Sequence, residues 1–183
     1  MTTSIPSLIS LPHSVFANPA ASILLPIALG TTAGLSSGTK KIRTVYHVIE
    51  KPPLSPPTQA FGPAWTLLYG LMGYVSHRVV TGPPSSLVSA DQIEALYTAQ
   101  LGVNLLWMPI FFGTRRVDLA AADVVLLTGL NGYLTYLYFS VDNVAGWCQV
   151  PYLAWLSFAT YLTVGVGYLN NWNISEAKLA KKA

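Results

Sequence analysis

Residues 124–141 read VVLLTGLNGYLTYLYFSV and contain no Lys, Arg, Asp or Glu. Because a helix needs about 20 mainly apolar residues to cross a bilayer, a stretch of this kind predicts one membrane span. The chain holds four more stretches without a charged residue, at residues 1–39, 52–77, 95–114 and 143–175. Each has room for one span, and together they leave too little chain for a soluble domain.

The composition of the whole chain indicates the same class of protein. Of its 183 residues 52% are hydrophobic and only 9% are charged, whereas a soluble domain carries roughly 25% charged residues. A soluble enzyme, a disordered chain and a nucleic-acid binder are therefore excluded. The net charge of +3 does not change this, because the basic residues lie in short clusters between apolar blocks. Cys148 is the single cysteine, so it forms no internal disulfide and no multi-thiolate metal site.

We therefore predict an all-α fold, a multi-pass integral membrane bundle of five transmembrane helices that forms a single domain over residues 1–183. A proline-rich loop at 38–60 joins the first two helices. The predicted helices are roughly 17–37, 61–81, 93–113, 119–140 and 148–170.

The basic residues predict which ends of the helices face the cytosol. All Lys and Arg except Arg78 fall in the first and third connecting segments or after the last helix. By the positive-inside rule, this asymmetry places the C-terminus in the cytosol and the N-terminus away from it. Termini on opposite sides require an odd number of spans, which agrees with five. The basic residues assigned to the cytosolic side are Lys40, Lys41, Arg43, Lys51, Arg115, Arg116, Lys178, Lys181 and Lys182.

The segment Lys51-Pro52-Pro53-Leu54-Ser55-Pro56-Pro57 precedes the second predicted helix. Proline fixes φ and lacks a backbone N–H, so this segment is predicted to be stiff and extended, with Pro63 in the first turn of the following helix. A connection of this length between membrane helices suits a lid over a cavity. A spacer without contact to any pocket is the alternative that these residues leave open.

Aromatic residues recur at helical spacing in the second and third predicted helices. Phe61, Trp65 and Tyr69 follow one another at steps of four and so share one helix face. A second stripe, at steps of three and four, consists of Tyr97, Gln100, Asn104 and Trp107. Ring faces with a few hydrogen-bonding groups suit a flat, polycyclic, mostly apolar ligand. Ordinary packing between helices, with Asn104 in a helix-to-helix hydrogen bond, is the alternative.

Three groups of motifs carry a resemblance to a known family. They are Lys51-Pro52-Pro53 and Pro56-Pro57 with Phe61-Gly62-Pro63-Ala64-Trp65-Thr66-Leu67-Leu68-Tyr69, then Asn104-Leu105-Leu106-Trp107-Met108-Pro109-Ile110-Phe111-Phe112-Gly113, and last Pro151-Tyr152-Leu153-Ala154-Trp155-Leu156. In order and spacing they resemble the second, third and fifth helices of the TspO/MBR translocator proteins, also called peripheral-type benzodiazepine receptors. The likeness runs from about Gly30 to Trp172.

The resemblance implies a five-helix bundle in membrane lipid, whose pocket near the first loop binds tetrapyrroles (porphyrin, haem precursors), sterols and synthetic aromatic ligands. It also implies the mitochondrial outer membrane as the location if the source is eukaryotic. Small residues that leave room for a neighbouring backbone, together with the resemblance, predict a homodimer through helix three at Ala95, Ala99 and Gly102, with packing inside the bundle as the alternative. The pocket residues carried over to this sequence are Phe61, Gly62, Ala64, Trp65, Tyr69, Asn104, Trp107, Leu126, Trp155, Ala159 and Leu162.

The chain departs from the family pattern at several of these places. Leu54 stands where the proline loop usually has an aromatic residue, and Leu105 and Met108 replace a tryptophan and a proline of helix three. At the end of helix five, Val164 and Tyr168 occupy the positions of the Tyr and Arg of the animal cholesterol-recognition motif. That motif is therefore absent at its family position.

Titratable residues offer little for catalysis. The sequence contains no general acid–base pair, nucleophile arrangement or metal-ligand spacing, so we expect a binding protein or translocator without catalytic residues, metal or cofactor. The alternative, implied by the resemblance to bacterial members, is an enzyme-like oxidative or light-dependent degradation of porphyrin that uses tryptophans such as Trp65. Asp123 falls within the fourth predicted helix, where we expect it to pair with Arg115 or Arg116 or to act in ligand passage.

Overall fold

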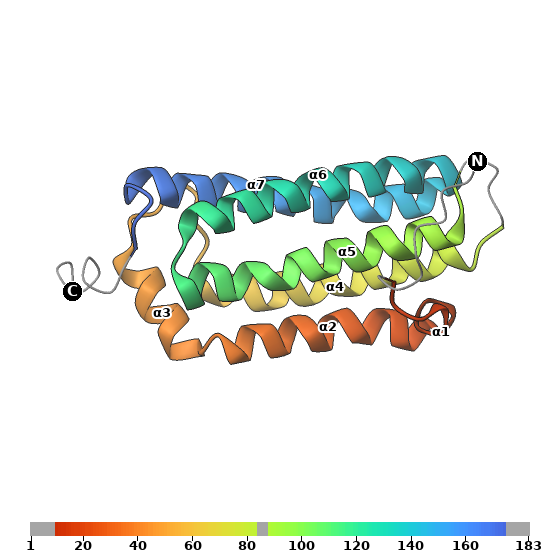
Figure 1. The fold of residues 1–183 in the computed structure, drawn as a ribbon, viewed down its shortest axis with the longest axis horizontal. Coiled ribbons are helices and arrows are strands. Elements are labelled where there is room, and N and C mark those ends of the chain that lie inside the picture. Colours follow the sequence, from red (N-terminus) through yellow and green to blue (C-terminus); the bar gives the residue numbers. More distant parts are fainter. Residues whose placement is uncertain (1–9, 84–87, 175–183) are drawn as a thin grey trace.

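The computed structural model describes residues 10–83 and 88–174, and of residues 39–41 the backbone alone. Within these ranges every regular element is a helix, and no strand is present (Figure 1). Lys178, Lys181 and Lys182 of the predicted cytosolic cluster lie outside the described residues. The helices are α1 (His13–Ala17), α2 (Pro19–Ser36), α3 (Thr39–Val48), α4 (Thr58–Val80), α5 (Ala90–Met108), the π-helical turn η2 (Pro109–Thr114), α6 (Val117–Val141) and α7 (Asn143–Leu169).

Short polar side chains fix where three of the helices begin. Asn18 accepts hydrogen bonds from the backbone N–H groups of the first turn of α2, and Pro19 in that turn has no N–H group and so needs no acceptor. Ser89 accepts a hydrogen bond from the first turn of α5, and Asp142 accepts one from the first turn of α7. These caps pair backbone groups that a helix end leaves unsatisfied, so each helix starts at a defined residue.

The long helices α2, α4, α5, α6 and α7 run side by side along the long axis of the molecule (Figure 1). Their main contacts pair α6 with α7, α2 with α4, α5 with α6 and α4 with α7. The short helix α3 lies at the end of the bundle where α6 begins and α7 ends, and α1 lies at the opposite end (Figure 1). His13 of α1 contacts Glu94 of α5, with 2.7 Å between Nδ1 and Oε1.

Four helical segments among the described residues are long and apolar enough to cross a membrane, namely Pro19–Ser36, Ala90–Thr114, Val117–Val141 and Asn143–Leu169. α4 is also long enough, with 23 residues, but its Gly, Thr, Tyr and His residues make it less apolar. The predicted all-helical membrane fold is confirmed for the described residues. Each predicted helix range overlaps one of the five long helices.

The prediction of a continuous loop at 38–60 is wrong in its first half, because α3 occupies Thr39–Val48. Ile42, Val45 and Ile49 recur at helical spacing, and Val45 and Ile49 are buried. Burial of this apolar face against the end of the bundle stabilises a helix too short to be stable alone. Besides Gly38, the irregular part of this range is residues 49–57, which contain the prolines.

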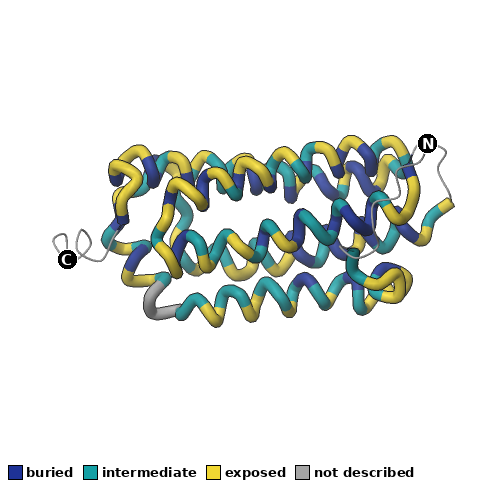
Figure 2. The backbone as a smooth tube through the Cα atoms, viewed as in Figure 1, coloured by how far each residue is buried: buried dark blue, intermediate teal, exposed yellow. Residues whose placement is uncertain are grey.

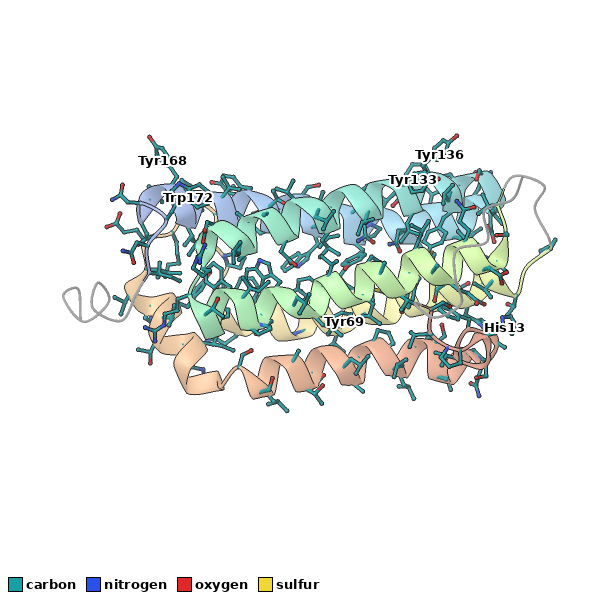
Figure 3. All side chains as sticks on the ribbon, in the orientation of Figure 1. His13, Tyr69, Tyr133, Tyr136, Tyr168 and Trp172 are labelled. Atoms are coloured by element: carbon teal, nitrogen blue, oxygen red, sulfur yellow. The ribbon has the colours of Figure 1, made fainter. Side chains whose placement is uncertain are left out.

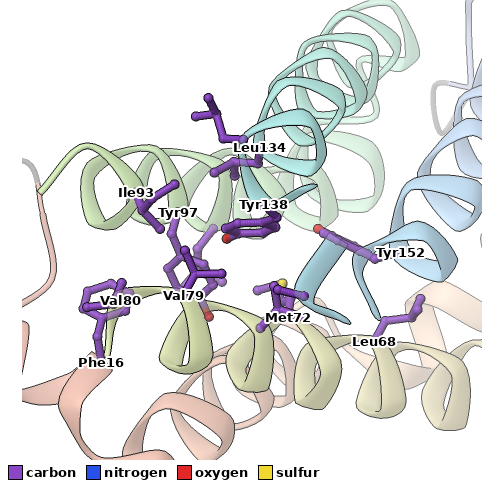
Figure 4. Packing of buried hydrophobic residues seen from close by; sticks show 14 of the residues in the cluster. Phe16, Leu68, Met72, Val79, Val80, Ile93, Tyr97, Leu134, Tyr138 and Tyr152 are labelled. Atoms are coloured by element: carbon purple, nitrogen blue, oxygen red, sulfur yellow. The ribbon is translucent and has the colours of Figure 1, made fainter. Parts of the chain in front are cut away.

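Buried residues line the inner faces of the helices, and exposed residues cover the outside (Figure 2). Met72, Tyr138 and Tyr152 meet in the centre of the bundle (Figure 4). α2 and α4 approach each other closely at Gly73, where an added Cβ would lie only 2.2 Å from the carbonyl oxygen of Ser22. The absence of a side chain at Gly73 is therefore required for this contact.

Aromatic side chains project outward at both ends of the bundle (Figure 3). Tyr133 and Tyr136 do so near one end, and Tyr168 and Trp172 near the other. Tyr and Trp are enriched where a membrane protein meets the water interface on either side of the bilayer. The distribution fits a bundle that crosses the bilayer along its long axis.

Candidate ligand-binding cavity

A cavity of about 480 Å³ opens within the bundle at the end where α3 lies. Its walls come from α2, α3, the segment after α3, α4, α5 with η2, α6 and α7. The lining is mostly apolar and aromatic, with a few polar groups. This size and composition are typical of sites for small organic ligands.

The wall formed by α4 and α7 is a connected set of aromatic rings. Trp65 and Trp155 meet edge to face, with ring centroids 6.4 Å apart and planes at 87°. Phe61 packs against Trp155 at 6.2 Å, and Tyr46 of α3 packs against Phe61 at 5.8 Å. Such edge-to-face contacts hold the rings in fixed orientations, so the wall offers preformed aromatic surfaces.

The opposite wall depends on the π-helical turn at the end of α5. Pro109 cannot donate a backbone hydrogen bond, and the chain widens from an α-helix into a π-helix at this residue. Trp107 stacks on Phe111 at 4.9 Å with an interplanar angle of 20°, and Phe112 meets the Trp107 ring edge to face at 6.0 Å. All three rings line the cavity.

The floor of the cavity is a hydrogen-bonded pair, Tyr69 and Asn104. The Tyr69 hydroxyl donates to Asn104 Oδ1 at 2.5 Å, and Asn104 Nδ2 donates to the hydroxyl of Tyr152 at 2.9 Å. Tyr152 then donates to Gln100 Oε1 at 3.3 Å. Gln100 belongs to the predicted stripe but lies behind the floor and is not among the lining residues. Its amide group is therefore not available for a hydrogen bond to a ligand in the cavity.

This polar chain continues through the middle of the bundle. Asn131 Nδ2 donates to Gln100 Oε1 at 3.2 Å, and Gln149 Nε2 donates to Asn131 Oδ1 at 3.1 Å. Asn131, Gln100 and Gln149 are buried. The chain of hydrogen bonds joins α4, α5, α6 and α7 and fixes the side chain of Asn104 at the floor.

Residues 49–57, called the lid below, line one end of the cavity through Ile49, Lys51 and Ser55 and are tied to the end of α7. Asn170 binds the backbone of Glu50 at both polar groups, since its Nδ2 donates to the Glu50 carbonyl at 2.8 Å and its Oδ1 accepts from the Glu50 N–H at 3.2 Å. The Tyr161 hydroxyl donates to the Pro53 carbonyl at 3.0 Å. Lys51 and Ser55 of the lid line the cavity, which favours the lid over the spacer alternative.

Close packing and a second tether add to this attachment. A Cβ at Gly165 of α7 would lie 2.7 Å from Cγ of Pro52, so the lid packs directly on a glycine. The Tyr46 hydroxyl donates to the Pro56 carbonyl at 2.6 Å. Burial raises the pKa of Tyr46, so this hydroxyl stays protonated and remains a donor.

The structure brings most of the predicted pocket residues together. Ala64 and Leu126 are the exceptions, because neither lines the cavity, and Leu126 is 55% exposed on the outer face of α6. Val124 and Leu127 of α6 line it instead. The predicted residues that do line the cavity are Phe61, Gly62, Trp65, Tyr69, Asn104, Trp107, Trp155, Ala159 and Leu162.

Several aromatic lining residues were not predicted. Phe111 follows Trp107 by four residues and Phe158 follows Trp155 by three, so helical spacing from a predicted residue identifies both. Phe112 reaches the cavity only because of the π-helical turn. Tyr46 lies on α3, within the range predicted as loop.

The charged groups at the cavity are all cationic. Arg43 and Lys51 are lining residues, and among the described residues no Asp, Glu or His lines it. The Lys51 ammonium donates to the Tyr46 carbonyl at 2.7 Å and lies 4.5 Å from the centroid of the Tyr46 ring. Two buried donors, Nε1 of Trp107 and Nε1 of Trp155, have no hydrogen-bond partner in the part of the chain that the structure describes.

One expectation for Asp123 was an ion pair with Arg116, and the structure does not show this pair. Arg116 instead binds Asp118 through two hydrogen bonds of 2.9 and 2.7 Å. The Oδ2 atom of Asp123 is buried without a hydrogen-bond partner among the described residues. The described residues also contain no group of three or more His, Cys, Asp or Glu side chains with metal-binding geometry.

Comparisons with known proteins all identify one family. The sequence pattern of the TspO/MBR family matches residues 22–169. A translocator protein homolog of Schizosaccharomyces pombe is 43% identical over 148 residues, which cover 80% of this chain and 88% of the relative. The tryptophan-rich sensory protein of Cereibacter sphaeroides is 38% identical over 133 residues (73% of this chain and 80% of the relative). The translocator protein of Homo sapiens is 38% identical over 117 residues (64% and 69%). With its apolar helices, this chain is an integral membrane protein that belongs to the TspO/MBR family.

Proposed function

We propose that the chain binds tetrapyrroles (porphyrin and haem precursors) in the cavity beneath the lid, and sterols as a second class. The observation that carries this proposal is the cavity itself, in which two aromatic walls face a volume of about 480 Å³. Flat ring systems gain most from such walls, because ring faces stack on them while ring edges meet the polar floor. Two of its relatives are named translocator proteins, and we propose for this chain the same role, the binding and translocation of a ligand.

Binding is supported over catalysis by the groups that line the cavity. Trp, Tyr, Phe, Asn and two cations offer stacking and hydrogen bonds. A general acid–base pair requires two groups that exchange protons near neutral pH, and the lining within the described residues provides no carboxylate or imidazole for this purpose. We therefore propose a binding protein, with oxidative or light-dependent porphyrin degradation as the alternative.

We further propose that α4 is a fifth membrane span and that the end bearing α3 faces the cytosol. α4 lies between α2, α5 and α7, so a bilayer that contains those helices also contains α4. Arg43, Lys51, Arg115 and Arg116 belong to segments at the α3 end, as the positive-inside rule requires of a cytosolic face. If the protein comes from a eukaryote, we propose that it lies in the mitochondrial outer membrane, because its family implies this location.

Titration of the purified protein in detergent with protoporphyrin, and separately with a sterol, tests the binding proposal. Tryptophan fluorescence should be quenched saturably, and Trp107→Ala should weaken protoporphyrin binding by roughly ten- to a hundred-fold, since loss of a stacking ring costs about 1–3 kcal/mol. Trp147→Ala is the matched control, because Trp147 is 67% exposed and far along α7 from the cavity. Equal effects of both substitutions on a folded protein would contradict the proposed site. New product peaks under illumination would support degradation.

A further inference from the structure

The chain does not leave the bundle directly at the end of α7 but turns back toward α3 (Figure 1). Residues 170–174, called the strap below, make this turn. The Trp172 N–H donates to the Gly167 carbonyl at 2.7 Å, and the Asn171 N–H donates to the Tyr168 carbonyl at 3.3 Å. These two hydrogen bonds form a Schellman cap, which ends a helix with one residue in the left-handed region.

The strap contains one left-handed residue more than such a cap requires. Asn171 has a φ of 52° at the position where the cap places its left-handed residue, and Trp172 follows with a φ of 55°. Left-handed backbone is unfavourable for a residue with a Cβ, and more so for a bulky one. The backbone at Trp172 is therefore strained, and contacts elsewhere in the strap must hold it.

The first of these contacts is made by the Trp172 ring, which packs on a buried glycine of α7. A Cβ at Gly167 would lie 2.5 Å from Cε3 and from Cζ3 of Trp172, so the ring occupies the space that any side chain at this position would fill. Because the ring rests directly on the helix, the two left-handed residues direct the following chain back to the bundle. The absence of a side chain at Gly167 is required for this path.

The second contact is the burial of Ile174 at the end of the strap. Ile174 is only 1% exposed and belongs to the apolar cluster that contains Val45 of α3 and Ile49, the first residue of the lid. The other buried members come from η2, the start of α6 and the end of α7, namely Phe111, Phe112, Val117, Ala120 and Val166. Ile174 thus joins the end of the chain to the surface on which α3 rests.

The strap holds α3 and the lid at adjacent points. α3 has ten residues, and a helix of this length is not stable without packing against other elements. Its support includes Ile174, and the lid that follows is bound by Asn170 through both polar groups of the Glu50 backbone. Because Asn170 and Ile174 lie at the two ends of one five-residue segment, they leave the bundle together if the segment moves.

We propose that the strap is a two-state switch that holds α3 and the lid in place when docked and lets both move when released. Burial of Ile174 favours the docked state, whereas the strained backbone at Trp172 favours release. Release relieves this strain, which offsets part of the lost burial and brings the released state closer in free energy than for an unstrained segment. The proposal goes beyond the proposed function, since it concerns a movement that needs no ligand.

Amide hydrogen exchange in detergent, without ligand, tests the switch. The reporter is the Ile49 N–H group at the end of α3, which donates to the Val45 carbonyl at 3.1 Å. Ile174→Ser removes the apolar anchor, and Gly167→Ala displaces the Trp172 ring. Each substitution should raise the exchange rate of Ile49 at least about tenfold and leave amides in the middle of α5 and α6 unchanged.

Two control variants match these changes. Gly129→Ala adds the same methyl group on α6, where a Cβ meets nothing within 4 Å, so it should exchange as the wild type does. Ile174→Val keeps most of the buried apolar surface and should raise the rate less than Ile174→Ser.

The remaining outcomes overturn the proposal. Wild-type exchange at Ile49 in both test variants would show that the strap does not hold α3. Faster exchange in the middle of α5 and α6 as well would show that these residues stabilise the whole bundle and form no separate switch. An effect of Ile174→Ser without one of Gly167→Ala would reduce the strap to an ordinary packing contact. None of these results bears on ligand binding, which the protoporphyrin titration tests separately.

Discussion

Substitution of Asn170 by Ala should release the lid without unfolding the bundle. The Asn170 side chain is buried at the end of α7 and makes two hydrogen bonds to the backbone of Glu50, at 2.8 and 3.2 Å. A hydrogen bond contributes about 0.5–1.5 kcal/mol net to stability, so the loss of both lowers the free energy of lid opening by about 1–3 kcal/mol. At about 1.4 kcal/mol per factor of ten, the open fraction of the lid should rise roughly 5- to 150-fold.

Amide hydrogen exchange measures this change directly and needs no ligand. The N–H group of Glu50 reports on the lid, because it donates to Asn170 Oδ1 at 3.2 Å. Under conditions in which exchange follows the opening equilibrium, the exchange rate of this amide in Asn170→Ala should rise by at least the factor given above, while amides in the middle of α5 and α6 stay unchanged.

Asn143→Ala is the matched control for this substitution, since Asn143 is exposed at the opposite end of the same helix. It should leave exchange in the lid at the wild-type rate. If the Asn170 and Asn143 variants give the same lid exchange, the two hydrogen bonds do not hold the lid and the reasoning fails. If α5 and α6 exchange faster as well, Asn170 stabilises the whole bundle and not the lid alone.

Three further predictions address topology, assembly and pH. A protease added from the cytosolic side should remove a tag placed after Ala183 and spare one placed before Met1, and the reverse result would invert the proposed orientation. Ala99→Leu should lower the dimer fraction in mild detergent, because Ala99 and the exposed Gly102 form a small-residue surface on α5, and an unchanged fraction would count against this interface. Partial burial opposes ionisation of Asp142, but hydrogen bonds from Arg78 and from the first turn of α7 outweigh it and lower the pKa of Asp142 below its ordinary value near 3.8. The stabilisation that the ionised Asp142 carboxylate provides is therefore present above pH 3.8 and is lost as pH falls through the lowered pKa. On acidification, the melting temperature in detergent should drop more in the wild type than in Asp142→Asn, whose side chain retains a capping oxygen but does not ionise.

The positions of the long helices follow from sequence because charge is costly in a bilayer. The charge-free apolar stretches therefore locate each long helix, while charged residues fall only near its ends: α6, predicted at 119–140, extends over Val117–Val141 and holds Asp118 and Asp123 in its first turns. The faces of those helices are harder to predict. Residues 124–127 are Val-Val-Leu-Leu, and in a membrane the lipid-facing side is as apolar as the inner side. Hydrophobic periodicity thus cannot distinguish Leu127, which is 1% exposed, from Leu126, which is 55% exposed.

Polar residues carry the information that apolar ones lack. Asn131 and Asn104 mark the inner faces of α6 and α5, because an amide exposed to lipid would lack a hydrogen-bond partner. The position of Leu127 four residues before Asn131 therefore identifies its face, whereas Leu126 is five residues before Asn131 and falls elsewhere. The same reasoning fails for α3, which lies outside the long apolar stretches. Its lysines, and the prolines that follow it at 52–57, are more prominent in the sequence than its apolar face.

The distribution of hydrogen bonds indicates which part of the site moves. Beneath the cavity, side-chain hydrogen bonds join four helices through Tyr69, Asn104, Gln100, Asn131 and Gln149, so a gap opened between those helices would leave buried polar groups unpaired in an apolar medium. The lid, in contrast, is tied to α7 mainly by Asn170, Tyr161 and the Gly165 contact, and its backbone groups can bind water when released. Opening the lid therefore costs less free energy than parting the helices. We expect ligand exchange to proceed by movement of the lid over a floor that stays closed, so that Asn170→Ala accelerates ligand association and dissociation together and changes the dissociation constant less than either rate.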